Sequence, residues 1–256
     1  MSSSLPGTVL PRWIPLTTSI GFLLKHVRIL GWSLLLVAAT GMLTWFGYIG
    51  ALDFITGLTG HFFQQAPEAT GLWGWFVVKG WLLLKYFSFI VIRIIAFYLA
   101  FLVAYCLTTP GYVFLSTATE KIYLGRAFTS DDGFTLSGMI TDLVEGCKIG
   151  AFGVLVTMAA LVANFIPVVG PIVVLLMYTF YSALMFVDYP SSRYHWSLGR
   201  KIGWVRDYYK RSFRLGIVPA LISMVPFVNI FVMALLFPLF TVHTTLNFIA
   251  VEQRRK

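Results

Sequence analysis

Two apolar turns decide the fold that this sequence predicts: Ile166-Pro167-Val168-Val169-Gly170-Pro171 and Val225-Pro226-Phe227-Val228-Asn229. Each turn contains no charged residue and lies between two long apolar runs. Turns in water are normally polar, because their exposed backbone needs solvation. Irregular backbone at membrane depth is tolerated only where it is buried in protein or lines a cavity. The two turns therefore predict two helical hairpins that enter a bilayer and return to the same side.

The composition is that of an integral membrane protein. Of the 256 residues, 58% are hydrophobic and 11% are charged, and the mean hydropathy is +0.83. A soluble domain has about 25% charged residues. No polar block is large enough to fold alone, so we expect one membrane domain over residues 1–256. The net charge of +9 lies in short segments beside apolar runs, which predicts no nucleic-acid partner.

The apolar runs and the charges between them set the expected segments. In chain order these are an interfacial amphipathic lead-in at 1–28, a transmembrane helix at 29–52, an external loop at 53–70, a second transmembrane helix at 71–107, cytoplasmic helices at 108–148, a re-entrant hairpin at 149–187, a basic amphipathic segment at 188–214, a second hairpin at 215–250 and a cytoplasmic tail at 251–256.

The segment lengths favour two full crossings and two partial ones. We expect the lead-in to run directly into the first transmembrane helix. Pro110 is expected to end the second, because proline cannot continue a helix. The arms of the first hairpin are about 16 to 18 residues long, at or below the lower limit for a spanning helix. The second hairpin is expected to have a first arm of about 11 residues and a longer second arm.

The distribution of Lys and Arg gives the orientation. The 53–70 loop contains neither residue, whereas 188–214 contains seven of them. Cytoplasmic loops carry the excess of Lys and Arg, so both termini are expected in the cytoplasm. Five apolar residues recur at helical spacing in the basic segment, namely Leu198, Ile202, Val205, Tyr209 and Phe213. This pattern predicts a basic amphipathic helix that lies on anionic lipid headgroups.

Candidate anion-binding groups follow from charge and helix ends. Arg93 lies within an apolar run, where a cation costs about 2.5 to 3.5 kcal/mol to insert. Two interpretations remain open: Arg93 binds an anion, or the helix is shifted outward and Arg93 extends to the interface. The hairpin tips, with Pro167, Gly170, Pro171, Pro226 and Asn229, each provide a helix N-terminus that favours an anion. Asn229 is a binding candidate through its amide, with helix capping as the alternative.

Enzymatic motifs are missing from the sequence. It contains no His-Glu-x-x-His, no Gly-x-Ser-x-Gly and no P-loop, and its four histidines are isolated. Cys106 and Cys147 form no Cys-x-x-Cys pair. We therefore expect no catalytic residue, no metal site and no cofactor.

Three ordered stretches resemble one family of membrane proteins. These are Asn164-Phe165-Ile166-Pro167-Val168-Val169-Gly170-Pro171, Met185-Phe186-Val187-Asp188-Tyr189-Pro190 and Met224-Val225-Pro226-Phe227-Val228-Asn229-Ile230-Phe231-Val232-Met233. They are similar to the bacterial CysZ sulfate permeases, which belong to the etoposide-induced membrane protein family. The resemblance implies a homo-oligomeric, multi-pass inner-membrane protein that moves sulfate inward for cysteine biosynthesis.

One element of that family is absent. Its members carry Gly-Leu/Ile-Arg-Arg near the start of the first long helix, associated with sulfate binding, where this chain has Ile29-Leu30-Gly31-Trp32. Only Arg28, just upstream, can substitute, and it joins Arg93 and Asn229 as a substrate-binding candidate. The alternatives are therefore a permease for a different substrate and a membrane organising protein that does not transport.

Overall fold

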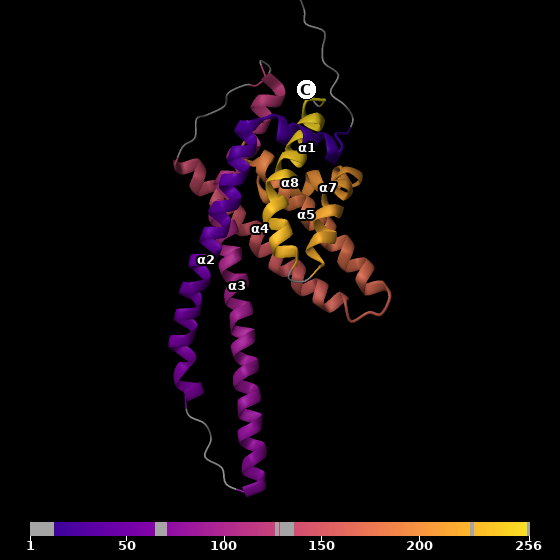
Figure 1. The fold of residues 1–256 in the computed structure, drawn as a ribbon. Helices are drawn as coiled ribbons and strands as arrows, with labels where there is room; N and C mark the ends of the chain where they lie inside the picture. The colour runs from indigo at the N-terminus through magenta and orange to yellow at the C-terminus, as the bar shows by residue number, and fades with distance from the viewer. Residues whose placement is uncertain (1–12, 65–70, 126–127, 129–135, 226–227, 255–256) are drawn as a thin grey trace, which may run out of the picture. The chain divides into compact units, whose positions relative to one another are not determined.

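The described chain is entirely helical (Figure 1). The computed structural model describes residues 13–64, 71–125, 128, 136–225 and 228–254, and these contain no β-strand. The helices within them are α1 Leu16–Lys25, α2 Val27–Gln64, α3 Gly71–Leu124, α4 Leu136–Ala163, α5 Val169–Ser192, α6 Leu198–Asp207, α7 Tyr209–Ser223 and α8 Val228–Glu252. Among these residues, α2, α3, α4, α5 and α8 are long and apolar enough to cross a membrane. The prediction of an all-α membrane protein is confirmed.

The contacts divide the chain into a smaller unit, Ala38–Leu107, and a larger unit, Met1–Val37 with Thr108–Lys256. In the smaller unit α2 and α3 pack closely at Gly47, where an added Cβ would lie 3.2 Å from the Cβ of Ala100. The rings of Tyr48 and Phe97 meet nearby, with centroids 5.9 Å apart. Small residues allow such close approach between membrane helices. This division is based on contacts alone and does not test the prediction of a single domain.

Helix α8 forms the centre of the larger unit. In the most apolar 18-residue stretch of α8, 72% is buried inside the protein, whereas 17% of the corresponding stretch of α4 is buried. It packs against α1, α5 and α7 (Figure 1). Helices α5 and α7 also approach closely, because Gly216 lies directly against the carbonyl oxygen of Thr179. Val187, Leu215 and Phe248 belong to the core between these helices.

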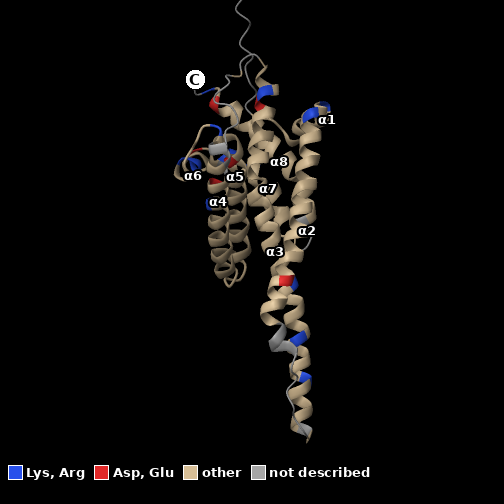
Figure 2. Cartoon of the chain, turned by 90° about the vertical axis from the view of Figure 1, so that its left-hand side faces the viewer, with Lys and Arg blue, Asp and Glu red and all other residues tan. Residues whose placement is uncertain are grey.

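The charges of the larger unit gather away from the tip of the α4–α5 hairpin. Figure 2 shows coloured residues around α6 and near the C-terminus, whereas the turn that joins α4 to α5 is uncharged. The large side chains at this tip are exposed, including Phe165 and Val168. An exposed apolar tip is the arrangement expected of a turn that lies in lipid rather than in water.

The arms of the first hairpin are longer than expected. Helices α4 and α5 have 28 and 24 residues, and each contains a stretch long and apolar enough to span a membrane. The prediction of short arms was wrong because a charged residue that is paired inside the protein does not end a helix. Helix α5 continues through Asp188, whose carboxylate is buried and paired with Lys201. The re-entrant depth of this hairpin stays a prediction.

The tip of the hairpin is a tight turn around Val168. This residue has φ 66° and ψ −50°, and the N–H of Val169 donates to the carbonyl of Pro167 at 2.7 Å. These values describe a γ-turn of the rare, strained type, which a β-branched residue adopts only under constraint. Gly170 lies directly against the carbonyl oxygen of Ala163, so a Cβ would clash there. The closed geometry of the tip therefore depends on Gly170.

Cysteine labelling at the tip tests its depth. In a variant with Cys106 and Cys147 replaced by Ser, we expect Val168→Cys to resist a membrane-impermeant maleimide added outside the cell. A matched control, Ala66→Cys, lies in the predicted external loop and should label rapidly. The measurement is the fraction of protein shifted in mass after a fixed time. Rapid labelling of Val168→Cys from outside would establish a full crossing and overturn the re-entrant prediction.

The second hairpin consists of α7, with 15 residues, and α8, with 25 residues. A short first arm and a longer second arm were expected, although α7 begins earlier than predicted, at Tyr209. Pro226, which was predicted at the tip of this second hairpin, lies outside the described residues.

Three boundaries differ from the sequence-based expectation. Helix α3 continues through Pro110 to Leu124, because in membrane helices neighbouring groups can satisfy the backbone that proline leaves unpaired. The lead-in does not run directly into α2, since His26 interrupts the helix with φ −106° and ψ 87°. The basic segment forms two helices rather than one, because Tyr208, with φ −108° and ψ 38°, separates α6 from α7.

Candidate functional site

A buried ion cluster joins α4, α5 and α6. Lys201 is completely buried, its Nζ donates to Asp188 Oδ1 at 2.6 Å, and it lies 3.5 Å from Glu145 Oε2. Lys148 Nζ donates to Glu145 Oε1 at 2.6 Å, and Ser192 Oγ donates to the carbonyl of Asp188 at 2.9 Å. Two cations and two carboxylates balance each other. The cluster therefore braces three helices and has no excess positive charge for an anion.

A second balanced pair lies at the end of α3. Arg193 Nη1 is 2.8 Å from Glu120 Oε2, and the Tyr194 hydroxyl donates to Glu120 Oε1 at 3.1 Å. Burial, together with the nearby Glu120 carboxylate, raises the pKa of Tyr194 to about 12, so its hydroxyl stays protonated and donates. Glu120 therefore neutralises Arg193, and this pair also has no excess charge.

The segment before α1 and the first turn of α1 are held on α8 by polar side chains. The Ile14 N–H donates to Asn247 Oδ1 at 3.0 Å, and Asn247 Nδ2 donates to the Ile14 carbonyl at 3.0 Å. Ser19 Oγ and His243 Nδ1 are hydrogen-bonded at 2.9 Å. The ring of Trp13 meets the imidazole of His243 edge-on, with centroids 5.5 Å apart. These contacts fix Trp13 beside the helices of the larger unit.

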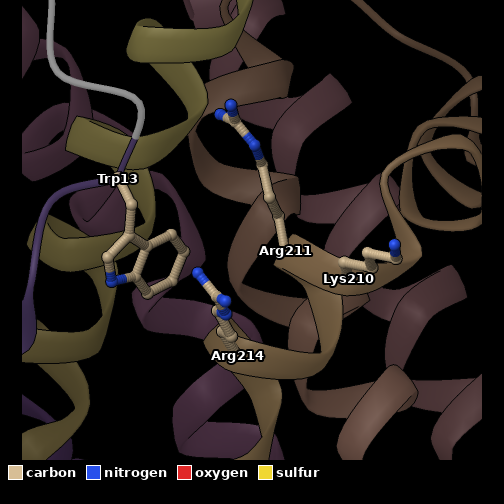
Figure 3. A pocket seen from close by; sticks show the side chains of 4 residues that line it. All are labelled: Trp13, Lys210, Arg211 and Arg214. Carbon is tan, nitrogen blue, oxygen red and sulfur yellow. The ribbon is translucent and has the colours of Figure 1, made fainter.

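A basic pocket lies between this segment and the start of α7. Its volume is about 230 Å³, and it is lined by Trp13, Lys210, Arg211 and Arg214. Arg214 points toward the ring of Trp13, with its guanidinium carbon 5.6 Å from the ring centroid (Figure 3). Arg211 and Lys210 extend in other directions from the same helix. The pocket thus combines three cations with one indole ring.

The positive charge of this pocket is not neutralised within the described residues. Neither arginine of the pocket nor Lys210 forms an ion pair with a carboxylate there. The Nη1 atom of Arg211 is buried and has no hydrogen-bond acceptor among the described residues. Burial, and then the nearby Arg254 and Arg214, lowers the pKa of Arg211, because each disfavours its charged form. An anion in the pocket would relieve this repulsion.

The predicted substrate-binding residues occupy different places. Arg28 lies exposed in the first turn of α2, and Arg93 is exposed on α3 with its guanidinium 4.1 Å from the ring centroid of Phe89. Asn229 is in the first turn of α8, and its Nδ2 donates to the carbonyl of Ser223 at 2.9 Å, which ties it to the end of α7. The side-chain atom of Asn229 left without a partner is its acceptor oxygen. The roles of these three residues in anion binding stay predictions.

The first hairpin tip offers few donors to an anion. The N–H of Val169 donates to Pro167, and that of Gly170 donates to the carbonyl of Ile166 at 2.8 Å. Pro171, the next residue of α5, has no N–H. Anion binding at a helix N-terminus requires free N–H groups. The geometry of this tip therefore favours a structural role for Pro167, Gly170 and Pro171.

Sequence reasoning did not identify the pocket. Lys210, Arg211 and Arg214 were placed in a basic amphipathic segment, where their charge was assigned to the lipid surface. Their spacing puts Lys210 and Arg214 on one helix face, which was a usable signal. The contribution of Trp13 depends on a tertiary contact from the far end of the chain and had no local signal. Within the described residues, no group of His, Cys, Asp and Glu could hold a metal ion.

Comparison with known proteins places the chain in a family. The family model described as "Sulfate transporter CysZ/Etoposide-induced protein 2.4" matches residues 16–234. The match extends from the first residue of α1 into α8 and includes both proline turns. No curated protein matches the chain. The resemblance carried by the three ordered stretches is confirmed, and the chain belongs to the Sulfate transporter CysZ/Etoposide-induced protein 2.4 family.

Proposed function

We propose that this membrane protein is a permease that carries sulfate into a bacterial cell across the inner membrane, with both termini in the cytoplasm. The observation that carries the proposal is the family match over residues 16–234, in a chain with five helices suited by length and composition to cross a membrane within its described part. The protein performs no covalent chemistry in this proposal. Sulfate taken up in this way supplies cysteine biosynthesis.

The charge distribution supports an anion as cargo. Most of the net charge of +9 lies in segments expected in the cytoplasm, so the cation that bears on a path through the membrane is one within an apolar helix. Arg93 places such a cation in the apolar part of α3, at a cost that a functional contact would justify. The proposal therefore assigns Arg93 and Arg28 to the anion path.

The proposed assembly is a homo-oligomer. Many large apolar side chains on the smaller unit are exposed in the single chain, among them Trp45, Phe46 and Leu83. Lipid covers part of such a surface, and neighbouring copies cover the remainder in a symmetric assembly.

A permease for a different anion is the second candidate. It is favoured by Ile29-Leu30-Gly31-Trp32, which stands where the similar sulfate permeases carry a pair of arginines. A change of binding groups alters selectivity more readily than it alters the fold.

Growth on a defined sulfur source tests the cargo in cells. In a bacterial strain that lacks sulfate uptake, we expect expression of this chain to restore growth on low sulfate, because the permease supplies sulfur for cysteine. Growth on cysteine serves as the control and should not depend on the chain. If expressed, membrane-inserted protein fails to restore growth on sulfate, the cargo is a different anion or the protein does not transport.

A further inference from the structure

We propose that the basic pocket of Trp13, Lys210, Arg211 and Arg214 is a binding site for a tetrahedral oxyanion, the chemistry shared by a phospholipid headgroup and by free phosphate or sulfate. The site is separate from the candidates Arg28, Arg93 and Asn229. The inference does not rest on the proposed transport function, because binding is measured without flux.

The pocket differs from the other charged clusters in its charge balance. Lys201 and Arg193 are each matched by a carboxylate within hydrogen-bonding distance, at 2.6 and 2.8 Å. Arg211 and Arg214 have no carboxylate partner within the described part of the chain. Like charges held together are costly unless an opposite charge joins them. Lys210 and Arg214 are exposed and Arg211 is half-buried, so an anionic ligand that enters from the surface would supply the opposite charge.

The donors suit an oxyanion with several oxygens. Each guanidinium presents N–H groups in a fixed planar fork, which matches phosphate and related anions. The buried Nη1 of Arg211 still requires an acceptor. The pocket is open to the surface, and its volume of about 230 Å³ leaves room for a tetrahedral oxyanion.

The surroundings favour a lipid as the source of this group. Tyr209 and Phe213, next to the pocket cations on α7, are exposed, and Trp13 lines the pocket itself. Tryptophan and tyrosine are enriched at headgroup level, and arginine and lysine extend their charges to the same depth. An anionic lipid can thus place its phosphate in the pocket and its chains along the adjacent apolar helices.

Binding by the purified full-length chain tests the proposal. The first arm measures retention of phosphatidylglycerol against phosphatidylcholine by native mass spectrometry. The second arm measures the shift in melting temperature caused by sodium phosphate or sodium sulfate at constant ionic strength. We expect Arg211→Gln/Arg214→Gln to weaken binding of the natural ligand about tenfold, because two charge-assisted contacts are lost. The loss should appear in the first arm if that ligand is a phospholipid and in the second if it is a free ion.

The matched control removes the same charge elsewhere in the basic segment. Arg200→Gln/Arg206→Gln alters an arginine stacked 4.3 Å from the Trp196 ring centroid and one that is exposed beside Asp207, and it should leave binding within about twofold of wild type. The double variant Arg211→Lys/Arg214→Lys keeps the charge but loses the planar guanidinium groups. Its binding should therefore lie between that of wild type and that of the glutamine variant.

The possible outcomes distinguish a lipid from a free ion as the ligand, and one outcome contradicts the proposal. If the glutamine variant loses only its retention of phosphatidylglycerol, the ligand is a lipid headgroup. If it loses only the salt-induced shift in melting temperature, the ligand is a free ion. Without ligand, the glutamine variant should melt at or above the wild-type temperature, because mutual repulsion is removed, so poor folding is distinguishable from lost binding. Equal binding by wild type, the glutamine variant and the control in both arms would overturn the proposal.

Discussion

Replacement of Lys201 by Met is expected to lower the free energy of unfolding by about 3–5 kcal/mol, the usual cost of removing one partner from a buried ion pair. Met fills nearly the same volume, so the loss reports charge rather than packing. The Asp188 carboxylate, 2.6 Å from Lys201 Nζ in wild type, would be left buried without its cation. The measurement is unfolding of the purified protein by sodium dodecyl sulfate in mixed micelles.

Two further variants make the Lys201 test specific. Lys148→Met removes a cation from the same cluster, but the Lys148 side chain is 53% exposed, so the expected loss is at most about 1 kcal/mol. The double variant Lys201→Met/Asp188→Asn removes both charges of the buried pair and should recover part of the stability. If Lys201→Met unfolds at the same detergent fraction as Lys148→Met, the cluster does not brace α4, α5 and α6 as described.

Replacement of Arg93 by Ala is expected to lower the initial rate of sulfate entry into liposomes about tenfold or more. A charge-assisted contact to the passing anion is worth enough for such a factor. Arg93→Lys keeps the charge and should retain more of the rate than Arg93→Ala. The matched control is Lys85→Ala, since Lys85 lies 5.1 Å from the ring centroid of Trp81, a setting expected at an interface. An unchanged rate for Arg93→Ala would favour the interpretation that Arg93 only extends to the interface.

Much of the architecture is local in the sequence and was therefore predictable. The apolar turn around Pro167 has no charge, and its hairpin is found between α4 and α5. Local rules failed where a tertiary partner compensates for a local cost. The first hairpin was expected to end at residue 187, but Lys201 neutralises Asp188 and α5 continues to Ser192. Pro110 was expected to end a helix, but it lies inside α3.

The candidate binding site was less predictable than the fold. The cations of α7 were visible as a charged segment, and their number suited a lipid surface. The pocket also requires Trp13, which is held in place through Ile14 and Asn247, residues at opposite ends of the chain. Such a contact has no signature in local spacing. Arg211 has no carboxylate partner within the described residues, and this likewise emerges only when its neighbours in space are known.

The most direct test of the account is the uptake of labelled sulfate by liposomes that contain the purified wild-type protein. Protein-free liposomes measure leakage, and excess unlabelled sulfate or chloride outside measures selectivity. We expect sulfate entry well above leakage, suppressed by unlabelled sulfate and not by an equal concentration of chloride. Entry at the leakage rate, with folded protein present at saturating density, would contradict the proposal that this member of the family is a sulfate permease.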